Sequence, residues 1–357
     1  MNTKSLSYCV SQIFILCLLV SCETTVEVEL PKYPVQLTAN SLFTADSIWK
    51  VELTQNRSVL ESAPFAPVND ADVRITGPNG VDIPLTYWKS APGTGNSLYR
   101  AEGERPLEGA TYSLAVKHPT LGNVMASGQI SQPPTPVLNV SWDTTDVRQE
   151  TDIYSTNTLY GVTITLDDPP EENYYSLSIM YRLSGIIRER DINGDGKPEY
   201  FIGKSNQGSG VNIQSDDPVI DNPFGGGLGE LYFKDVSFNG QEYALKLYMS
   251  QAFRVTNARY LDSFVPFKPL TTPYAFDVYD EEGNLIYPKG SIIYPYQLSV
   301  VLRTVTEEYY QYIYTRDLQA SVEDNPFAQP VQIYDNIDGG LGIFAGYSQT
   351  QYDFGIR

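Results

Sequence analysis

The chain has 357 residues, with 43 Asp and Glu, 24 Lys and Arg, one His and three Cys, which gives a formal net charge of -19. At about 150 residues per domain, this length predicts two domains that can each bury a core. The acidic balance argues against nucleic acid as a partner, because phosphates need a basic surface. Because His118 is the single histidine, most His-based catalytic triads and metal sites are excluded. Its place before Pro119 predicts a turn residue instead of a general base.

Residues 1–21 have the character of a secretory signal peptide. One charge, Lys4, precedes an apolar run from Ile13 to Val20, which is too short to span a bilayer but has the length of a signal's apolar region. The run ends in Leu19-Val20-Ser21-Cys22, and small residues directly before a cysteine resemble the bacterial lipobox. In a lipobox the signal is cut before the cysteine, which then receives a lipid. We therefore expect Cys22 to be lipidated; an ordinary signal with an accidental cysteine is the alternative.

Cleavage at this point would define the mature chain. Cys9 and Cys17 would leave with the signal, so no thiol would remain for a disulfide or for nucleophilic catalysis. Residues 22–34 would form the lipidated cysteine and a tether. With 43 acidic and 23 basic residues left, we expect the body to be repelled by anionic lipid and held at the membrane by its anchor alone.

Residues 35–133 alternate apolar and polar side chains in short runs, which is typical of half-buried strands. Turn residues such as Gly77-Pro78-Asn79-Gly80 separate the runs. The expected strands are 35–39, 48–53, 71–75, 98–101, 112–116 and 125–130. Strands at roughly ten-residue spacing predict an immunoglobulin-like β-sandwich. The Pro-rich stretch after Gln132 is typical of a linker, so we expect this domain to end at residue 133.

Residues 134–357 begin a second series of strands, so the fold class we predict is all-β. The expected strands are 161–166, 174–182, one near 231, 242–249 and 296–305. Residues 185–230 are rich in Gly, Asp and Asn and predict a long excursion, the kind of insertion that often carries function. The second domain should therefore be a larger β-sandwich with an insertion at about 185–230.

The sharpest local motif lies inside this excursion, at Asp191–Glu199. Its first half matches the D-x-[DN]-x-[DN]-G pattern of a calcium loop, in which alternate oxygen ligands converge on one cation. Position 12 of the loop is Ile202 instead of Glu, and the flanking residues predict strands instead of helices. A structural calcium site and a bare hairpin turn both stay open. The calcium candidates are Asp191, Asn193, Asp195, Lys197 and Glu199.

One short helix is expected from Thr306 to about Ala320. Thr306 can cap it, and Glu307 and Glu308 suit the positive end of its dipole. Tyr310 and Ile313 would share its apolar face with Tyr314 and Leu318.

Tyrosine is the most abundant aromatic residue, with 27 copies. Tyrosine suits binding surfaces, and it also favours half-buried strands. We expect most of the tyrosines of the second half in the core and a few at an interface. The interface candidates are Tyr294, Tyr296, Tyr309 and Tyr310.

The closing segment carries the most specific motifs, Asp324-Asn325-Pro326-Phe327 and Gly339-Gly340-Leu341-Gly342-Ile343-Phe344. Weaker pieces lie at Phe238–Tyr243 and Ala71–Ile75. Together with the lipobox they resemble the DUF4249 family of Bacteroidetes outer-membrane lipoproteins, over nearly the whole mature chain. The resemblance implies no activity and no catalytic residue, but it does imply a gene beside a TonB-dependent receptor. From the residues themselves we predict a structural clasp, because the glycines let Ile343 and Phe344 insert into the sandwich.

The leading prediction is a lipid-anchored outer-membrane binding protein, not an enzyme, which assists a TonB-dependent receptor in nutrient uptake. Tethering would raise the effective concentration of ligand or partner. We assign the contact to the excursion 185–230 and to the second-domain tyrosines. Acidic residues just after Cys22 resemble a surface-export signal, and both the surface and the periplasmic face stay open. The alternatives are an adhesive or structural surface protein and, more remotely, a glycan or peptide hydrolase, whose carboxylate pair could lie anywhere in the sequence.

Overall fold

The computed structural model confirms the all-β class. Strands dominate the described residues, with one α-helix, α2, near the C-terminus. The described residues are 34–56, 66–90, 95–130, 133–151, 156–183, 186–190, 199–203, 208–221, 229–250, 252–254, 264–266, 277–280, 283–290, 296–322 and 328–354.

Seven antiparallel strands follow one another in the N-terminal region and form a continuous curved sheet. They are β1 (Leu37–Phe43), β2 (Lys50–Gln55), β3 (Asp72–Thr76), β4 (Asp82–Ser90), β5 (Ser97–Arg100), β6 (Thr111–His118) and β7 (Gly122–Ile130), with a 3-10 turn η1 (Pro78–Gly80) after β3. Their order in the sheet is β1-β2-β5-β4-β3-β6-β7. The sequence predicted all of them except β4, whose alternation is broken by the neighbours Tyr87 and Trp88.

The C-terminal segment supplies both remaining neighbours of this sheet. Strand β22 (Ile337–Asp338) pairs with β7, and β23 (Leu341–Phe354) runs parallel to β1. The two are joined by Gly339 and Gly340, so a tight turn carries the chain from one edge of the sheet to the other. A Cβ on Gly340 would lie 2.5 Å from the carbonyl oxygen of Leu37, which is why β23 can approach β1 so closely only with glycine here.

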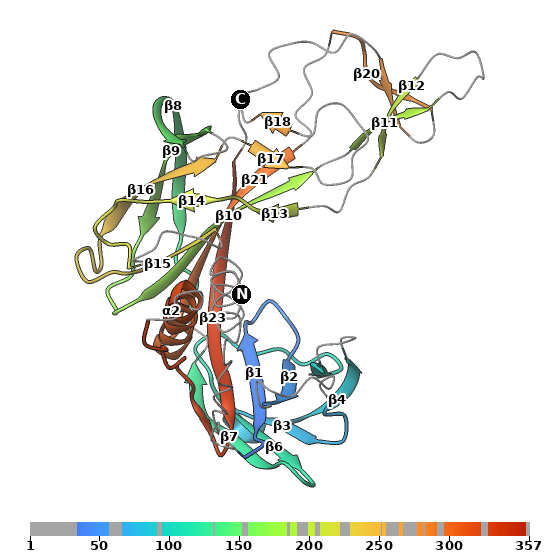
Figure 1. Ribbon diagram of the computed structural model, residues 1–357, viewed down its shortest axis with the longest axis vertical. Coiled ribbons are helices and arrows are strands. Elements are labelled where there is room, and N and C mark those ends of the chain that lie inside the picture. The colour runs from blue at the N-terminus through green and yellow to red at the C-terminus, as the bar shows by residue number, and fades with distance from the viewer. Residues whose placement is uncertain are drawn as a thin grey trace, which may run out of the picture. The chain divides into compact units, whose positions relative to one another are not determined.

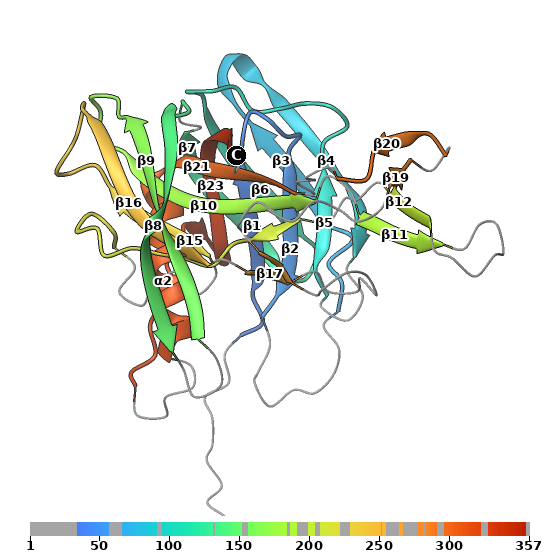
Figure 2. The same ribbon diagram turned by 90° about the horizontal axis from the view of Figure 1, so that it is seen from above.

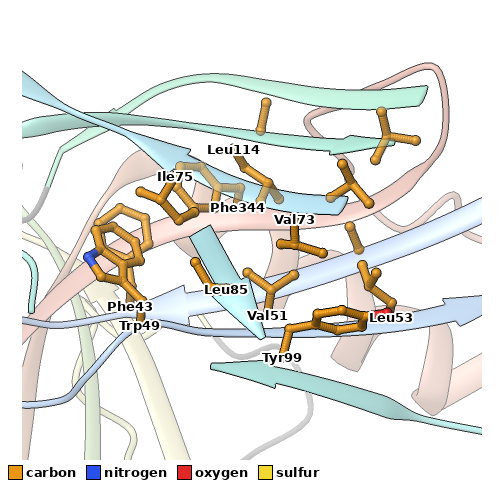
Figure 3. Packing of buried hydrophobic residues seen from close by; sticks show 14 of the residues in the cluster. Phe43, Trp49, Val51, Leu53, Val73, Ile75, Leu85, Tyr99, Leu114 and Phe344 are labelled. Carbon is orange, nitrogen blue, oxygen red and sulfur yellow. The ribbon is translucent and has the colours of Figure 1, made fainter. Parts of the chain in front are cut away.

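Aromatic side chains pack together within the N-terminal core (Figure 3). The ring centroids of Phe43 and Trp49 are 4.7 Å apart, and those of Phe43 and Phe344 are 4.8 Å apart. Phe344 comes from β23 and is fully buried, while Ile343 beside it is 1% exposed in a different core. The predicted clasp is thus confirmed, because burying both side chains fixes the last strand against the first.

The second region is a sandwich of two sheets. The strands named here are β8 (Val137–Thr151), β9 (Thr156–Asp167), β10 (Tyr174–Leu183), β13 (Gly208–Gly210), β14 (Ile213–Gln214), β15 (Glu230–Lys234), β16 (Glu242–Ser250) and β21 (Tyr296–Val305). One sheet has the order β14-β16-β9-β8. In the other, β10, β21 and β23 lie side by side, and β13 and β15 pair with β10 (Figures 1 and 2). Alternate side chains of both sheets meet in one apolar core, as the sequence predicted for a larger sandwich.

The helix α2 (Glu307–Val322) covers the other face of β10, β15, β21 and β23. The Thr306 hydroxyl accepts a hydrogen bond from the Tyr309 backbone N–H at 3.4 Å, which confirms the predicted cap. Tyr309, Tyr310 and Ile313 are buried against the sheet, while Tyr314 and Leu318 are only half-buried. The predicted helix is therefore correct, with its buried face shifted by about one residue toward the N-terminus.

The remaining strands lie outside these two cores. Strands β11 (Ile186–Arg190), β12 (Glu199–Gly203), β19 (Val278–Tyr279) and β20 (Leu285–Tyr287) form a small sheet, and β17 (Ala252–Arg254) pairs with β18 (Phe264–Pro266). The domain limits at residues 133 and 134 stay a prediction. The structure adds that β23 belongs to both regions, since it pairs with β1 in one and with β21 in the other.

Candidate functional site

Most of the predicted calcium ligands lie outside the described residues, namely Asp191, Asn193, Asp195 and Lys197, as does the expected lipidation site Cys22. Glu199 opens β12, where its register partner in the antiparallel pair is Arg190. The flanking strands β11 and β12 thus match the predicted hairpin. Among the described residues, no group of three His, Cys, Asp or Glu side chains is arranged to hold a metal ion. The calcium site remains a prediction.

Two of the four predicted interface tyrosines, Tyr309 and Tyr310, lie in the interior. Tyr309 and Tyr310 are 4% and 2% exposed, so their rings pack inside the protein instead of on a contact surface. Their burial follows from the first turn of α2 lying on the sheet, where Tyr310 packs 5.3 Å from the ring of Tyr174. Burial raises the pKa of Tyr309 to about 12. Tyr296 begins β21 opposite Leu183, and Tyr294 lies outside the described residues.

A polar network fixes α2 to the sheet. The Arg303 guanidinium pairs with Glu230 at 3.1 Å, and Glu230 also accepts a hydrogen bond from Ser176. The hydroxyl of Tyr232 donates a hydrogen bond to Asp317 of the helix at 2.8 Å. Burial is the main reason that the pKa of Tyr232 is raised. Arg316 pairs with Asp317 at 2.8 Å, so two guanidinium groups balance two carboxylates, and the network is best explained as a structural tie between helix and sheet.

Two buried carboxylates hold the loops at one end of the sandwich. Asp235 is fully buried, and its Oδ2 accepts a hydrogen bond from the backbone N–H of Asn173 at 2.8 Å. Asp168 accepts hydrogen bonds from Tyr175 and from the backbone N–H of Gly240. Burial raises the pKa of both carboxyls above their usual range. Each acid joins the loop before β10 to the loop after β15, which is a structural role.

The only histidine also has a structural place. His118 Nε2 lies 2.9 Å from Asp70, and its Nδ1 accepts hydrogen bonds from the backbone N–H groups of Thr120 and Leu121. Both ring nitrogens are thus engaged in holding the turn after β6. The hydrogen bonds to Thr120 and Leu121 confirm the predicted turn role of His118.

A hollow of 590 Å³ lies beside η1 and is lined by residues 76–78, 107–111 and 113. Glu108 is the one ionisable side chain in its lining. An acid–base pair needs two such groups, so this hollow offers no reaction chemistry of that kind.

The excursion predicted over 185–230 separates into two parts. Residues 208–221 return to the sandwich, where Val211 and Ile213 are buried in its core. Residues 186–190 and 199–203 form β11 and β12, which join β19 and β20 in a sheet that, within the described residues, shares no strand pairing with the others (Figure 1). We call these four strands the excursion sheet. Its strand β20 exposes Leu285 by 52% and Ile286 by 44%.

A second surface, which the sequence analysis missed, lies on the N-terminal sheet. Trp88 of β4 is 45% exposed, with the Lys89 amine 4.2 Å and the Arg100 guanidinium carbon 4.5 Å from its ring centroid. Lys50 of β2 stands directly opposite Arg100 of β5. We call these four residues the Trp88 surface. The signal was Tyr87-Trp88 itself, because neighbours on a strand point to opposite faces and one of them must leave a one-sided core.

Taken together, the fold is that of a β-sandwich protein in which a single C-terminal strand joins two cores. The chain belongs to the DUF4249 family, a domain of unknown function, whose profile matches residues 23–353. That match covers nearly the whole chain beyond the predicted signal peptide and confirms the family resemblance.

Other comparisons add little. No curated protein matches this chain. A solved chain described as "Biofilm associated protein - B domain" is 9% identical, over 89% of this chain and 85% of that chain, with a TM-score of 0.15. A TM-score this low does not indicate a shared fold. Within the described residues, no helix combines the length and the apolar character that crossing a membrane requires.

Proposed function

We propose that this protein is a lipid-anchored outer-membrane binding protein that assists a TonB-dependent receptor in nutrient uptake. The lipobox-like residues before Cys22 support the anchor, and the family resemblance supports the receptor. The observation that carries the proposal is the excursion sheet, which exposes the neighbours Leu285 and Ile286.

These two side chains explain why the sheet suits a partner. Leu285 and Ile286 are consecutive on β20, so they project from opposite faces, and both side chains are exposed. Exposed apolar side chains on a small sheet become buried when a partner packs against them. A lipid anchor would hold this surface in the same membrane as the receptor and raise its effective concentration.

The test is an affinity purification from the native host. We would tag the C-terminus, solubilise the membranes in mild detergent and quantify the receptor that co-elutes. Wild type should recover a TonB-dependent barrel in stoichiometric amount. The double variant Leu285→Ser/Ile286→Ser should reduce the recovered barrel about tenfold, the effect of losing contacts at the centre of an interface.

Two controls keep the result specific. Leu138→Ser removes a side chain that is 47% exposed on β8, and it should leave the recovery unchanged. Replacing residues 186–203 with a short glycine linker should abolish recovery while keeping the fold. A deletion of 208–221 would be uninformative, because it removes Val211 and Ile213 from the core.

The opposite result has a definite meaning. If the tag is accessible and no barrel co-elutes with the wild type, the accessory role is incorrect. A protein recovered alone would favour the adhesive or structural alternative, which surface labelling and attachment assays would then address.

A further inference from the structure

We propose that the Trp88 surface docks onto an anionic phospholipid bilayer, so that the N-terminal sheet rests against the membrane that carries the anchor. The inference rests on the lipid anchor of the proposed function, but not on the receptor. It concerns a surface that the excursion sheet does not share.

The first observation is an unbalanced pair of cations. Lys50 and Arg100 are direct partners across β2 and β5, so their side chains leave the sheet on the same face. Like charges placed opposite each other are destabilising. Among the described residues, no carboxylate forms an ion pair with either side chain or with Lys89. Glu52 lies on the same face and instead accepts a hydrogen bond from Asn96. An external anion would relieve this repulsion.

The second observation is the apolar material among these cations. Trp88 is 45% exposed beside Arg100, and Leu42 is 39% exposed on β1. Asn40 stands opposite Glu52 in this antiparallel pair, so Leu42, two residues after Asn40, and Lys50, two residues before Glu52, also share this face. Tryptophan rings favour the membrane interface, where their apolar body and polar N–H are both accommodated. Cations that lie between exposed apolar side chains match anionic headgroups above acyl chains.

The third observation is the uneven distribution of charge along the chain. Residues 34–133 hold nine acidic and seven basic residues, whereas residues 134–357 hold 31 acidic and 15 basic. The negative charge is therefore concentrated in the second region. Exposed charges are screened over about 8 Å at physiological salt, so distant carboxylates repel a membrane weakly while Lys50 and Arg100 attract it at contact. The expectation that the whole body is repelled holds only for evenly spread charge.

The length of the tether is the fourth observation. Residues 22–36 lead from the expected anchor to Leu37 at the start of β1. A segment of this length spans at most roughly 50 Å when fully extended. An anchored Cys22 would therefore keep β1 and the adjoining strands within reach of the bilayer. This restriction raises the effective concentration of a weak docking surface.

The experiment uses vesicle co-sedimentation with the chain from residue 22 onward. This chain keeps every described residue, lacks the apolar run 13–20 and carries Cys22→Ser to remove the anchor. We would compare phosphatidylcholine vesicles with vesicles that also contain phosphatidylglycerol, at low and at high salt. This Cys22→Ser protein, the wild type of the vesicle assay, should bind only the anionic vesicles, and high salt should release it.

Variants locate the contact. Lys50→Ala and Arg100→Ala should each lower partitioning about fivefold, the effect of one cation at an anionic surface. Trp88→Ala should lower it about tenfold. Lys117→Ala removes an exposed cation of β6 and should leave partitioning unchanged. Melting curves would confirm that each variant is folded. Subtracting the fluorescence spectrum of Trp88→Phe from that of the parent protein isolates the emission of Trp88. This emission should shift to shorter wavelength on anionic vesicles.

Two outcomes would overturn the proposal. One is equal binding of wild type and of the Lys50, Trp88 and Arg100 variants to anionic vesicles. The other is no vesicle binding while Trp88→Ala reduces the receptor recovered by purification, which would make the surface a protein contact. The vesicle assay contains no receptor, so an absence of vesicle binding would not contradict the accessory role. Likewise, an affinity purification that recovers no receptor would not contradict binding to vesicles.

Discussion

Gly342 stands at the closest approach of β23 to β1. Its φ is 120°, and a Cβ there would lie 2.1 Å from the carbonyl oxygen of Ala39. Any other residue would have both an unfavourable backbone conformation and a clash with a paired strand. The close packing of β23 against β1 therefore explains why the closing motif of the sequence contains glycine at position 342.

Gly342→Ala should consequently destabilise the protein by several times the cost of a positive φ alone. Gly80 is the matched control, because it has a φ of 76° but no atom within 4 Å of the place that a Cβ would take. Gly80→Ala should cost about 1 kcal/mol. Urea denaturation of both variants checks this, and equal losses of stability would contradict the role of close packing.

Asp235 predicts an unusual pH dependence. Burial raises the pKa of its carboxyl in the folded state, and its Oδ1 has no hydrogen-bond partner among the described residues. As pH rises from the ordinary pKa toward the raised one, the unfolded chain ionises first and unfolding becomes easier. The contribution of Asp235 to stability is thus present at low pH and decreases across that interval.

Asp235→Asn should remove this decrease. The free energy of unfolding of wild type minus that of Asp235→Asn should fall as pH rises through the interval, measured by urea denaturation at each pH. Asp82→Asn is a useful comparison, because the exposed Asp82 pairs with Arg74 and its pKa is lowered. A difference that rises with pH at Asp235 would contradict the assignment.

At the scale of elements, two tyrosine-containing pairs show how a neighbouring element decides burial. Tyr174 and Tyr175 project from opposite faces of β10, and both are covered because the second sheet lies on one face and α2 on the other. Tyr87 and Trp88 are likewise neighbours on β4, but no described helix covers β4, and they are 41% and 45% exposed. The difference lies in the covering layer and not in the residues.

The tie between α2 and its sheet predicts a coupled mutational effect. Arg303→Met removes the ion pair that the partly buried Glu230 makes with Arg303, and it should cost about 1–3 kcal/mol. The double variant Glu230→Gln/Arg303→Met should lose less than the sum of the single variants, because the interaction between the two charges is lost only once. Chemical denaturation of the four proteins measures the coupling, and simple additivity would show that the two side chains do not interact.

For the whole molecule, the decisive element is β23. It is parallel to β1 through Thr38–Phe43 and antiparallel to β21 through Leu298–Val305, and it places Phe344 in the N-terminal core. The N-terminal strands therefore complete their core only after the rest of the chain has been made.

A fragment of residues 34–133 should consequently fail to fold cooperatively by itself. Joining residues 335–349 to it through a flexible linker should restore a cooperative melting transition, because this adds Ile337, Phe344 and the partner strand of β1. Near-ultraviolet circular dichroism during heating would report the packing of Trp49. Cooperative melting of the short fragment would show that the N-terminal region is independent of β23.

The sequence by itself determined much of this protein. Period-two alternation predicted most of the strands, the Thr306 cap with its acidic pair predicted the helix, and Gly-rich spacing before Ile343 and Phe344 predicted the clasp. These features are local, since they depend on residues within a few positions of one another. The closing motifs and the weaker pieces also indicated the family that the profile match confirms.

Only the tertiary structure decided which side chains meet. The burial of Tyr309 and Tyr310, the division of the excursion at Gly208 and the cation pair at Lys50 and Arg100 depend on strands far apart in the sequence. Sequence periodicity gives the face of a strand but not the element that covers it, because coverage is set by long-range pairing. The strand β23, which joins the first strand to the last core, is the clearest case.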